Sequence, residues 1–107
     1  RLVYNLVENA IKYNHLDGQV TVTAYQKEKH IYLSVEDTGS GIPEDLRERV
    51  FEPFFRVDKS RSRELGGVGL GLALVREIVR VHDGSITVRA NPSGGTIFDV
   101  MFTQGYI

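Results

Sequence analysis

The chain has 107 residues, a formal net charge of −1 and no cysteine. This length suits one domain with its own core and is too short for two. The near-zero charge gives no indication of a nucleic-acid or membrane surface, and the lack of cysteine excludes disulfides, thiolate zinc sites and cysteine nucleophiles. No apolar run approaches membrane-spanning length, and no signal peptide is present. Because the chain lacks an initiator methionine and opens inside an expected helix, we expect it to be a piece of a longer protein.

The first expected element is a helix over residues 1–13, where apolar residues recur at helical spacing. Asn5 and Asn9 lie four residues apart and share a helix face, with Lys12 three residues beyond Asn9. Asparagine is a mediocre helix former, because its amide competes for backbone hydrogen bonds. The pair therefore suggests side chains that bind something, although two solvent-facing polar residues would give the same pattern.

Alternating apolar residues over 20–25 and 31–36 predict two half-buried strands that form an antiparallel hairpin. The second strand leads into Asp37, followed by the spaced glycines Gly39 and Gly41. A carboxylate at a strand end beside glycine backbone can accept a hydrogen bond from an exocyclic amine of a ligand. The alternative is a tight turn in which Asp37 caps its own backbone. We expect Pro43 to occupy the first position of a short helix over 44–50.

The next segment is aromatic and then strongly charged. Phe51, Phe54 and Phe55 surround a proline, and we expect them to anchor a loop. Residues 56–64 hold four basic and two acidic side chains and almost no apolar ones. A charged, serine-rich segment between an aromatic anchor and glycines is typical of a mobile lid whose basic side chains meet phosphates. A merely solvated loop is the alternative.

Four glycines within residues 66–71 precede an apolar run that predicts a helix over 69–82, buried on most of its sides. A glycine turn that leads into a helix N-terminus can bind an anion such as phosphate, and it can equally serve as a hinge or packing point. Asp83 and Gly84 are expected to end this helix. Residues 86–90 and 96–102 predict a second hairpin.

Together these elements predict one α/β domain over residues 1–107, a two-layer sandwich in which three helices cover one face of a mixed, largely antiparallel sheet. Strands that come in hairpins argue against a Rossmann unit. The glycines are not followed by Gly-Lys-Ser/Thr, so the chain has no P-loop.

Four motifs now agree in order and spacing with one family. Residues 5–13 (NLVENAIKY) resemble the N box of sensor histidine kinases, and residues 37–42 (DTGSGI) resemble their first glycine box. Residues 51–56 (FEPFFR) are similar to the F box, and residues 67–72 (GVGLGL) to the second glycine box. The resemblance covers residues 1 to about 103. It implies the Bergerat fold, which is shared with DNA gyrase, mismatch-repair and heat-shock chaperone ATPases.

The resemblance also implies an adenine-binding end. The residues concerned are Tyr13, Asp37, Gly39, Gly41, Ile42 and Thr96. Asp37 would accept a hydrogen bond from the adenine 6-amino group, and Gly41 would give the base room. Thr96 would join the water network beside the base, and Tyr13 would pack near it.

At the phosphate end the resemblance implies that Asn9, and by position Asn5, hold Mg²⁺ against the triphosphate of ATP, since an amide oxygen is a suitable hard ligand. Lys12 would contact phosphate. Arg56 matches an arginine that can approach the γ-phosphate, and the lid would span about 56–67, with Lys59 and Arg61 as looser candidates. The second glycine box would supply backbone at the phosphates through Gly67, Gly69, Leu70 and Gly71.

The same comparison favours a kinase over a hydrolase. The related ATPases carry a water-activating glutamate four residues before the second N-box asparagine, where this chain has Asn5. The phosphoryl acceptor would be a histidine, which is already nucleophilic when its imidazole is neutral. The candidates in this chain are His15, His30 and His82. His82 precedes Asp83, which is similar to the His-acid pair of an acceptor helix, but it stands before a glycine at a helix end and is expected to cap a helix C-terminus.

The acceptor is therefore expected outside the chain, on dimerisation helices upstream, with a response regulator as the onward partner. The family implies a cytoplasmic domain, monomeric alone, of a homodimeric membrane-bound bacterial parent. Two alternatives stay open: a Bergerat-fold serine kinase of the anti-sigma-factor kind, and a non-catalytic binding module.

Overall fold

The computed structural model describes residues 2–55 and 71–103 of the chain. The elements, in order, are α1 (Leu2–Lys12), β1 (Val20–Lys27), β2 (His30–Asp37), the 3₁₀ turns η1 (Glu44–Leu46) and η2 (Arg49–Phe51), α3 (Gly71–Val81), β3 (Ser85–Ala90) and β4 (Thr96–Thr103). The two long helices and both hairpins expected from the sequence are confirmed.

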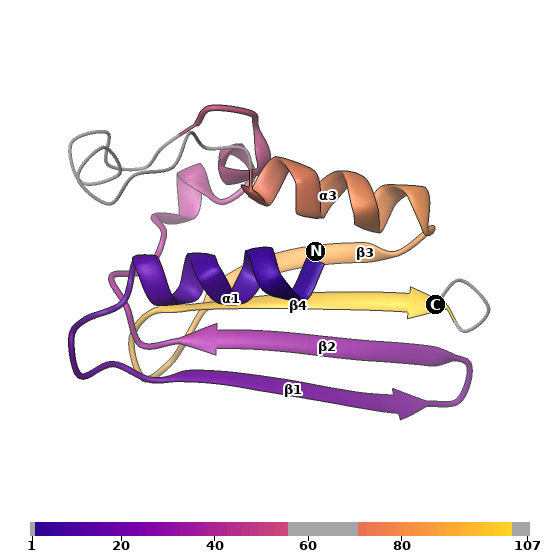
Figure 1. Cartoon of the computed structure of the whole chain (residues 1–107), viewed down its shortest axis with the longest axis horizontal. Helices are drawn as coiled ribbons and strands as arrows, with labels where there is room; N and C mark the ends of the chain where they lie inside the picture. The colour runs from indigo at the N-terminus through magenta and orange to yellow at the C-terminus, as the bar shows by residue number, and fades with distance from the viewer. Residues whose placement is uncertain (1, 56–70, 104–107) are drawn as a thin grey trace.

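The four strands form one sheet in the order β1-β2-β4-β3, as Figure 1 shows. Each hairpin pairs its own strands, and β2 joins β4 across the middle of the sheet. Val35 stands opposite Val22 on one side and Phe98 on the other, so apolar positions fall into register on the same face. Every pair in the described residues is antiparallel, which agrees with the largely antiparallel sheet expected from the sequence, although no parallel pair accompanies it there.

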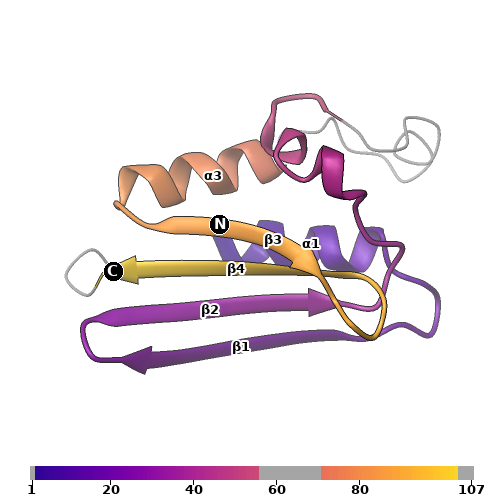
Figure 2. The ribbon, with the colours of Figure 1, turned by 180° about the vertical axis from the view of Figure 1, so that it is seen from behind.

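Both long helices pack on the same face of this sheet. In Figure 1 α1 lies in front of the strands, and in the reverse view of Figure 2 the strands lie in front of α1. The predicted two-layer sandwich is therefore confirmed. The prediction of one helix over 44–50, however, was wrong. The N–H of Leu46 donates to the carbonyl of Pro43, and the N–H of Glu52 donates to the carbonyl of Arg49. These three-residue spacings make two separate 3₁₀ turns, and Pro43 precedes the first of them.

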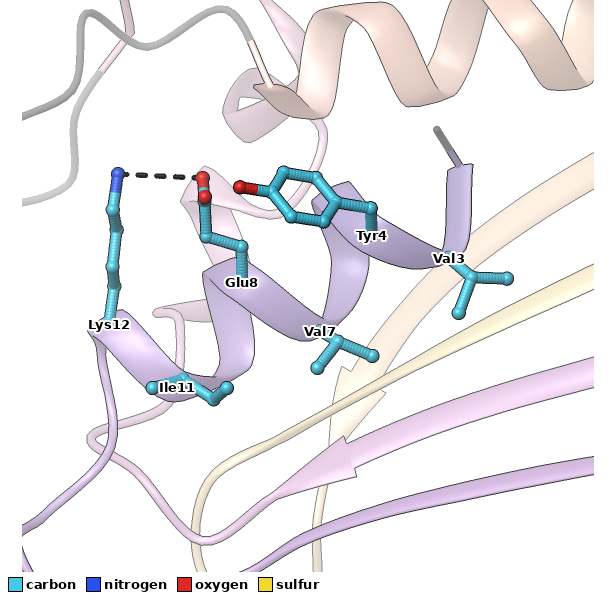
Figure 3. Close-up of a pocket in the computed structure, with 6 residues that line it drawn as sticks. All are labelled: Val3, Tyr4, Val7, Glu8, Ile11 and Lys12. Carbon is cyan, nitrogen blue, oxygen red and sulfur yellow. Dashed lines mark ion pairs between the residues drawn. The ribbon is translucent and has the colours of Figure 1, made fainter.

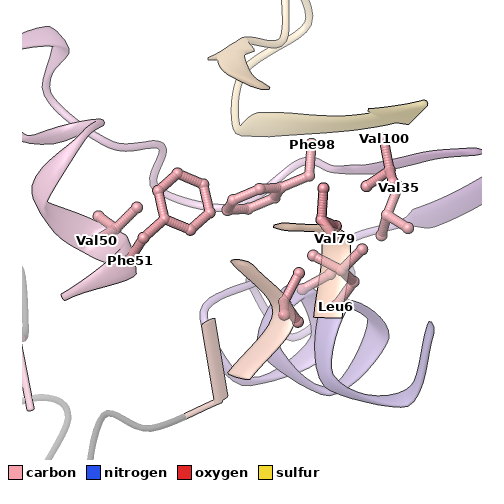
Figure 4. Packing of buried hydrophobic residues seen from close by; sticks show 9 residues of the cluster. Leu6, Val35, Val50, Phe51, Val79, Phe98 and Val100 are labelled. Atoms are coloured by element: carbon pink, nitrogen blue, oxygen red, sulfur yellow. The ribbon is translucent and has the colours of Figure 1, made fainter. Parts of the chain in front are cut away.

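The core lies between the helices and the sheet, where Figure 4 shows its side chains meeting. Leu6 of α1 and Val75 of α3 are fully buried and belong to one cluster with residues of the strands. The rings of Phe98 in β4 and Phe51 in η2 meet edge to face, with 6.1 Å between their centres. This contact attaches η2 to the sheet, because an edge-to-face aromatic pair contributes about 0.5–1.5 kcal/mol beyond its buried area.

The prediction that α3 is buried on most sides was wrong. Only Val75 and Val79, four residues apart, are buried, whereas Leu74 is 36% and Val81 60% exposed. In a two-layer structure a helix covers the sheet with one face, and its other sides remain at the surface.

Two further expectations about burial need correction. Phe54 is 67% exposed and has a φ of 66°, so only Phe51 and Phe55 of the aromatic segment pack against the core. Strand β1, expected to be half-buried, is exposed at every residue after Val20, because it is the edge strand of the described sheet.

The end of α3 follows the sequence prediction. The N–H of Gly84 bonds the carbonyl of Val79, and Asp83 adopts a φ of 55°, which together form a Schellman cap. A Cβ on Gly84 would lie 2.5 Å from the main-chain oxygen of Met101, which explains the glycine. Nδ1 of His82 is 2.8 Å from the carbonyl oxygen of Ile78, so this nitrogen carries a proton and His82 caps the helix, as expected.

Candidate functional site

Three segments from distant parts of the sequence meet at one end of the molecule, on the left in Figure 1: the end of α1, the end of β2 at Asp37, and the turn that joins β3 to β4. The start of α3 at Gly71 lies against α1 at Asn5, farther from this end. The antiparallel order of the sheet produces this meeting, because β2 ends where β4 begins. The end of the N box and the first glycine box, which the sequence singled out, therefore lie side by side.

Asp37 is the buried carboxylate of this end, with 6% of its surface exposed. Its Oδ1 accepts hydrogen bonds from the N–H of Gly39 at 2.9 Å and of Thr96 at 3.2 Å. Burial raises the pKa of Asp37 above its ordinary value, and the two N–H donors oppose this by stabilising the ionised form. Within the described part of the chain, both bonds use the same carboxylate oxygen. The self-capping turn considered from the sequence is thus present, and it leaves the second oxygen for a ligand.

The loop after Asp37 is shaped by close backbone contacts. A Cβ on Gly39 would lie 2.2 Å from the main-chain oxygen of Tyr13, so only glycine lets the loop pack against the end of α1. Gly41 has a φ of 78°, a conformation that favours glycine, and the oxygen of Gly95 lies 3.5 Å from where its Cβ would be. Ile42 is partly buried and packs against the hydrophobic core, and its contact with nucleotide stays a prediction.

A second set of polar contacts joins this loop to α1, and the sequence analysis missed it. The hydroxyl of Thr38 donates to Oδ1 of Asn14 at 3.1 Å and accepts the N–H of Gln19 at 2.9 Å. Nδ2 of Asn14 donates to the carbonyl of Gln19 at 2.9 Å. The only available signal was a polar turn between helix and strand, which does not reveal a partner 24 residues away.

Asn5 occupies an unusual position for an amide. It is 8% exposed, and its Nδ2 is buried without a hydrogen-bond partner among the described residues. Its Oδ1 would lie 3.5 Å from a Cβ on Gly71, the first residue of α3. A buried polar group without a partner costs about 1–3 kcal/mol, so native proteins rarely keep one unless something else binds it. The described part of α3 begins at Gly71 beside this amide, and the positive end of a helix dipole lies at its N-terminus.

Lys12, a predicted phosphate contact, forms an ion pair with Glu8 across one helical turn at 3.7 Å, drawn as the dashed line in Figure 3. Both side chains are part-exposed, so the pair contributes only about 0.3–0.5 kcal/mol. An incoming phosphate can therefore recruit Lys12 at little cost. The same figure shows Val7 and Ile11 pointing away from this pair, and all four side chains, with those of Val3 and Tyr4, line a groove of ≈ 630 Å³ along α1.

The remaining predicted site residues divide in two. Asn9 is part-buried in the last turn of α1, and Thr96 is 5% exposed beside Asp37. Arg56, Gly67, Gly69, Leu70 and the predicted lid lie outside the described residues. Among residues 2–55 and 71–103 no three His, Cys, Asp or Glu side chains gather to hold a metal. A metal site at this end would therefore rely on amide and substrate oxygens.

The site thus combines a buried acid beside glycine backbone with a buried amide whose Nδ2 has no partner among the described residues. In agreement, residues 1–105 match the family model described as histidine kinase-, DNA gyrase B- and HSP90-like ATPase, and the chain belongs to this family. Within it, the chain is the ATP-binding catalytic domain of a sensor histidine kinase.

Relatives and solved structures support this assignment. The chain is 44% identical over 100 residues to sensor histidine kinase RppB of Synechocystis, covering 94% of this chain and 22% of RppB. The mycobacterial sensor histidine kinase MprB superposes with a TM-score of 0.84 at 36% identity, covering 95% of this chain and 69% of that one. Full-length ShkA in complex with AMPPNP superposes with a TM-score of 0.78 at 31% identity, covering 97% of this chain and 21% of ShkA. The chain thus spans about a fifth of the curated relatives it matches.

Proposed function

We propose that this domain binds ATP with Mg²⁺ at the end described above and donates the γ-phosphoryl group to a histidine on another domain of its parent protein. The observation that carries the proposal is the Asp37 carboxylate, buried with Oδ1 held by the N–H groups of Gly39 and Thr96. A carboxylate oriented in this way keeps one oxygen as an acceptor, which suits the 6-amino group of adenine and not the 6-oxo group of guanine.

At the base end, contacts among the described residues support the role of Gly39, Gly41 and Thr96. Gly39 lets the Asp37 loop approach Tyr13, and Gly41 has a φ of 78° and leaves out a side chain that would contact Gly95. Thr96 holds Oδ1 of Asp37 through its own N–H, and its hydroxyl is our candidate for the water network beside the base.

At the phosphate end, the residues fit a bound triphosphate. The unpaired Nδ2 of Asn5 is a donor for a phosphate oxygen, and the start of α3 at Gly71 supplies further N–H groups. Asn9 offers an amide oxygen to Mg²⁺, which neutralises charge on the phosphates when bound. Lys12 exchanges Glu8 for phosphate. Arg56 and the second glycine box remain predicted contributors.

The reaction needs no general base for water. A neutral imidazole nitrogen attacks the γ-phosphorus, the bond from this phosphorus to the bridging oxygen breaks, and ADP leaves with the bonding electrons. The residues named above position the phosphates and neutralise their charge, which is what phosphoryl transfer chiefly requires. An amide at Asn5, where the related ATPases have a glutamate, leaves water without activation.

We place the acceptor histidine on a dimerisation domain upstream, in a homodimeric parent that passes the phosphoryl group to a response regulator. The relatives' greater length supports additional domains. Within the described residues none of the helices has the length and apolar character of a membrane crossing. We infer a cytoplasmic position for this domain and a membrane-bound parent, because most sensor kinases are membrane-bound with a cytoplasmic catalytic domain.

The direct test mixes the chain with the parent's dimerisation domain and γ-labelled ATP. Label on that domain that is lost in acid and kept in alkali identifies phosphohistidine. Replacing Asn9 by alanine should remove the label, whereas Leu16→Ala, at a fully exposed residue, should not. Acid-stable label would assign the domain to the serine kinases, and ATP hydrolysis without label would overturn the kinase proposal.

A further inference from the structure

The turn between β3 and β4, residues 91–95, contacts the main chain of Asp37 as well as its side chain. The carbonyl oxygen of Asp37 accepts a hydrogen bond from Nδ2 of Asn91 at 2.9 Å, across 54 positions of sequence. A Cβ on Gly95 would lie 2.1 Å from that same carbonyl oxygen. The turn therefore contacts the backbone of Asp37, the residue that we assign to adenine binding. Thr96, next in the chain, donates its N–H to Oδ1 of Asp37.

Asn91 is built into this turn by both ends of its amide. Its Oδ1 accepts the N–H of Ser93 at 3.2 Å, while its main-chain N–H and carbonyl bond Gly95 and Gly94. The amide orientation is determined, since the oxygen faces a donor and the nitrogen faces a carbonyl. Asn91 is 8% exposed, so no water competes freely for these bonds. Its side chain thus links the shape of the turn to the position of the Asp37 backbone.

We propose that Asn91 is a positioning residue for adenine recognition: it holds the Asp37 backbone so that one carboxylate oxygen stays on its two N–H donors and the other faces the base. This inference rests on the proposed function of Asp37. The direction of a hydrogen-bond acceptor decides how well it distinguishes an amine from an oxo group, because these bonds weaken steeply when misaligned. Without the Asn91 bond, the Asp37 carbonyl and the turn lose their connection, and the carboxylate loses its fixed direction.

Asn91→Asp is the sharpest variant, because the two side chains have the same shape. An aspartate keeps an oxygen to accept the Ser93 N–H, but above neutral pH it places a second oxygen against the Asp37 carbonyl instead of a donor. Ser93→Asp is the matched control. It adds the same charge to the same turn at an exposed side chain and leaves the Asn91 amide in place. Circular dichroism checks that each variant is folded.

The readout is the ratio of affinities for ADP and IDP, measured by calorimetry above neutral pH. These nucleotides differ at position 6 of the base, an amine in ADP and an oxo group in IDP, so a general loss of stability lowers both affinities and leaves the ratio unchanged. Wild type and Ser93→Asp should prefer ADP by about tenfold or more. Asn91→Asp should lose most of this preference, chiefly through weaker ADP binding.

Retention of the full preference in Asn91→Asp would overturn the positioning role while leaving the proposed function intact. A wild-type chain without any preference would overturn Asp37 as the adenine acceptor, and the positioning role with it. If Asn91→Asp does not fold, NMR on the wild-type chain decides the matter. The side-chain NH₂ of Asn91 should shift on addition of ADP and not of IDP, whereas equal shifts with both nucleotides would refute the role.

Discussion

Replacing Asp37 by asparagine separates the structural contribution of this side chain from its contribution to binding. The asparagine oxygen can still accept the N–H groups of Gly39 and Thr96, which bond Oδ1 at 2.9 and 3.2 Å. Its NH₂ group then takes the place of the second carboxylate oxygen and meets the base as a donor. We expect the Asp37→Asn protein to fold normally, to bind adenine nucleotides poorly and to favour a 6-oxo base.

The magnitudes follow from the hydrogen bonds. A bond from a neutral donor to a charged acceptor contributes about 1.5–3 kcal/mol, so Asp37→Asn should weaken ADP binding about 10- to 150-fold. Asp37→Ala, in contrast, leaves the two buried N–H groups unpaired at about 1–3 kcal/mol each. The free energy of unfolding of Asp37→Ala should therefore lie about 2–6 kcal/mol below that of Asp37→Asn.

Two measurements check this prediction. Urea unfolding gives the free energy of unfolding for both variants, and calorimetry gives their affinities for ADP and IDP. Equal stability of Asp37→Ala and Asp37→Asn would refute the structural contribution of Oδ1. An unchanged ADP preference in Asp37→Asn would refute the direct contact with the base.

Three further predictions concern pH, the core and the phosphate end. ADP affinity, measured by calorimetry, should fall as the pH drops through the raised pKa of Asp37, because the protonated oxygen no longer accepts from an amine. The free energy of unfolding, measured by urea titration, should rise over the same range, because the folded state binds this proton more tightly than the unfolded state. The Asp37→Asn protein should show neither change. Phe98→Ala should lower the free energy of unfolding by about 3–5 kcal/mol, whereas Leu16→Ala, fully exposed, should stay within about 0.5 kcal/mol. Lys12→Met should lower the affinity for ATP about three- to tenfold more than the affinity for adenosine, and Glu8→Gln should raise the affinity for ATP up to about twofold. Both effects should become smaller at high salt. Equal losses of affinity for ATP and adenosine in Lys12→Met would show that Lys12 does not contact phosphate.

The sequence was sufficient for the elements whose signal is local. Periodic apolar residues located α1, and alternation located all four strands with their hairpins. The burial of α3 was overestimated, because counting apolar residues such as Leu74 and Val81 does not reveal that only one helix face meets the sheet. The burial of Phe54 was also overestimated. Its backbone has a left-handed φ and its side chain is exposed, and the residue pattern around it does not predict this conformation.

For the site, the sequence located the chemistry but not its supports. Asp37 and Gly41 followed from a motif with a known purpose, and the structure brings them close to Thr96. The contacts of Asn91 and Asn14 could not be predicted, because a polar residue in a turn gives no sign of a partner on a distant strand or loop. The unpaired Nδ2 of Asn5 likewise depends on how α1 packs against α3.

The central claim is that this chain binds ATP through the Asp37 end with Mg²⁺ at Asn9. The most direct test is calorimetric titration of a non-hydrolysable ATP analogue, with and without Mg²⁺, into the wild-type chain, Asp37→Asn and Asn9→Ala. The account predicts that the wild-type chain binds the analogue and that Mg²⁺ strengthens this binding. Asp37→Asn should weaken binding with or without the metal, and Asn9→Ala should abolish the effect of Mg²⁺ on binding. A folded wild-type chain that takes up no analogue, or an Asp37→Asn protein that binds it as tightly as wild type, would contradict it.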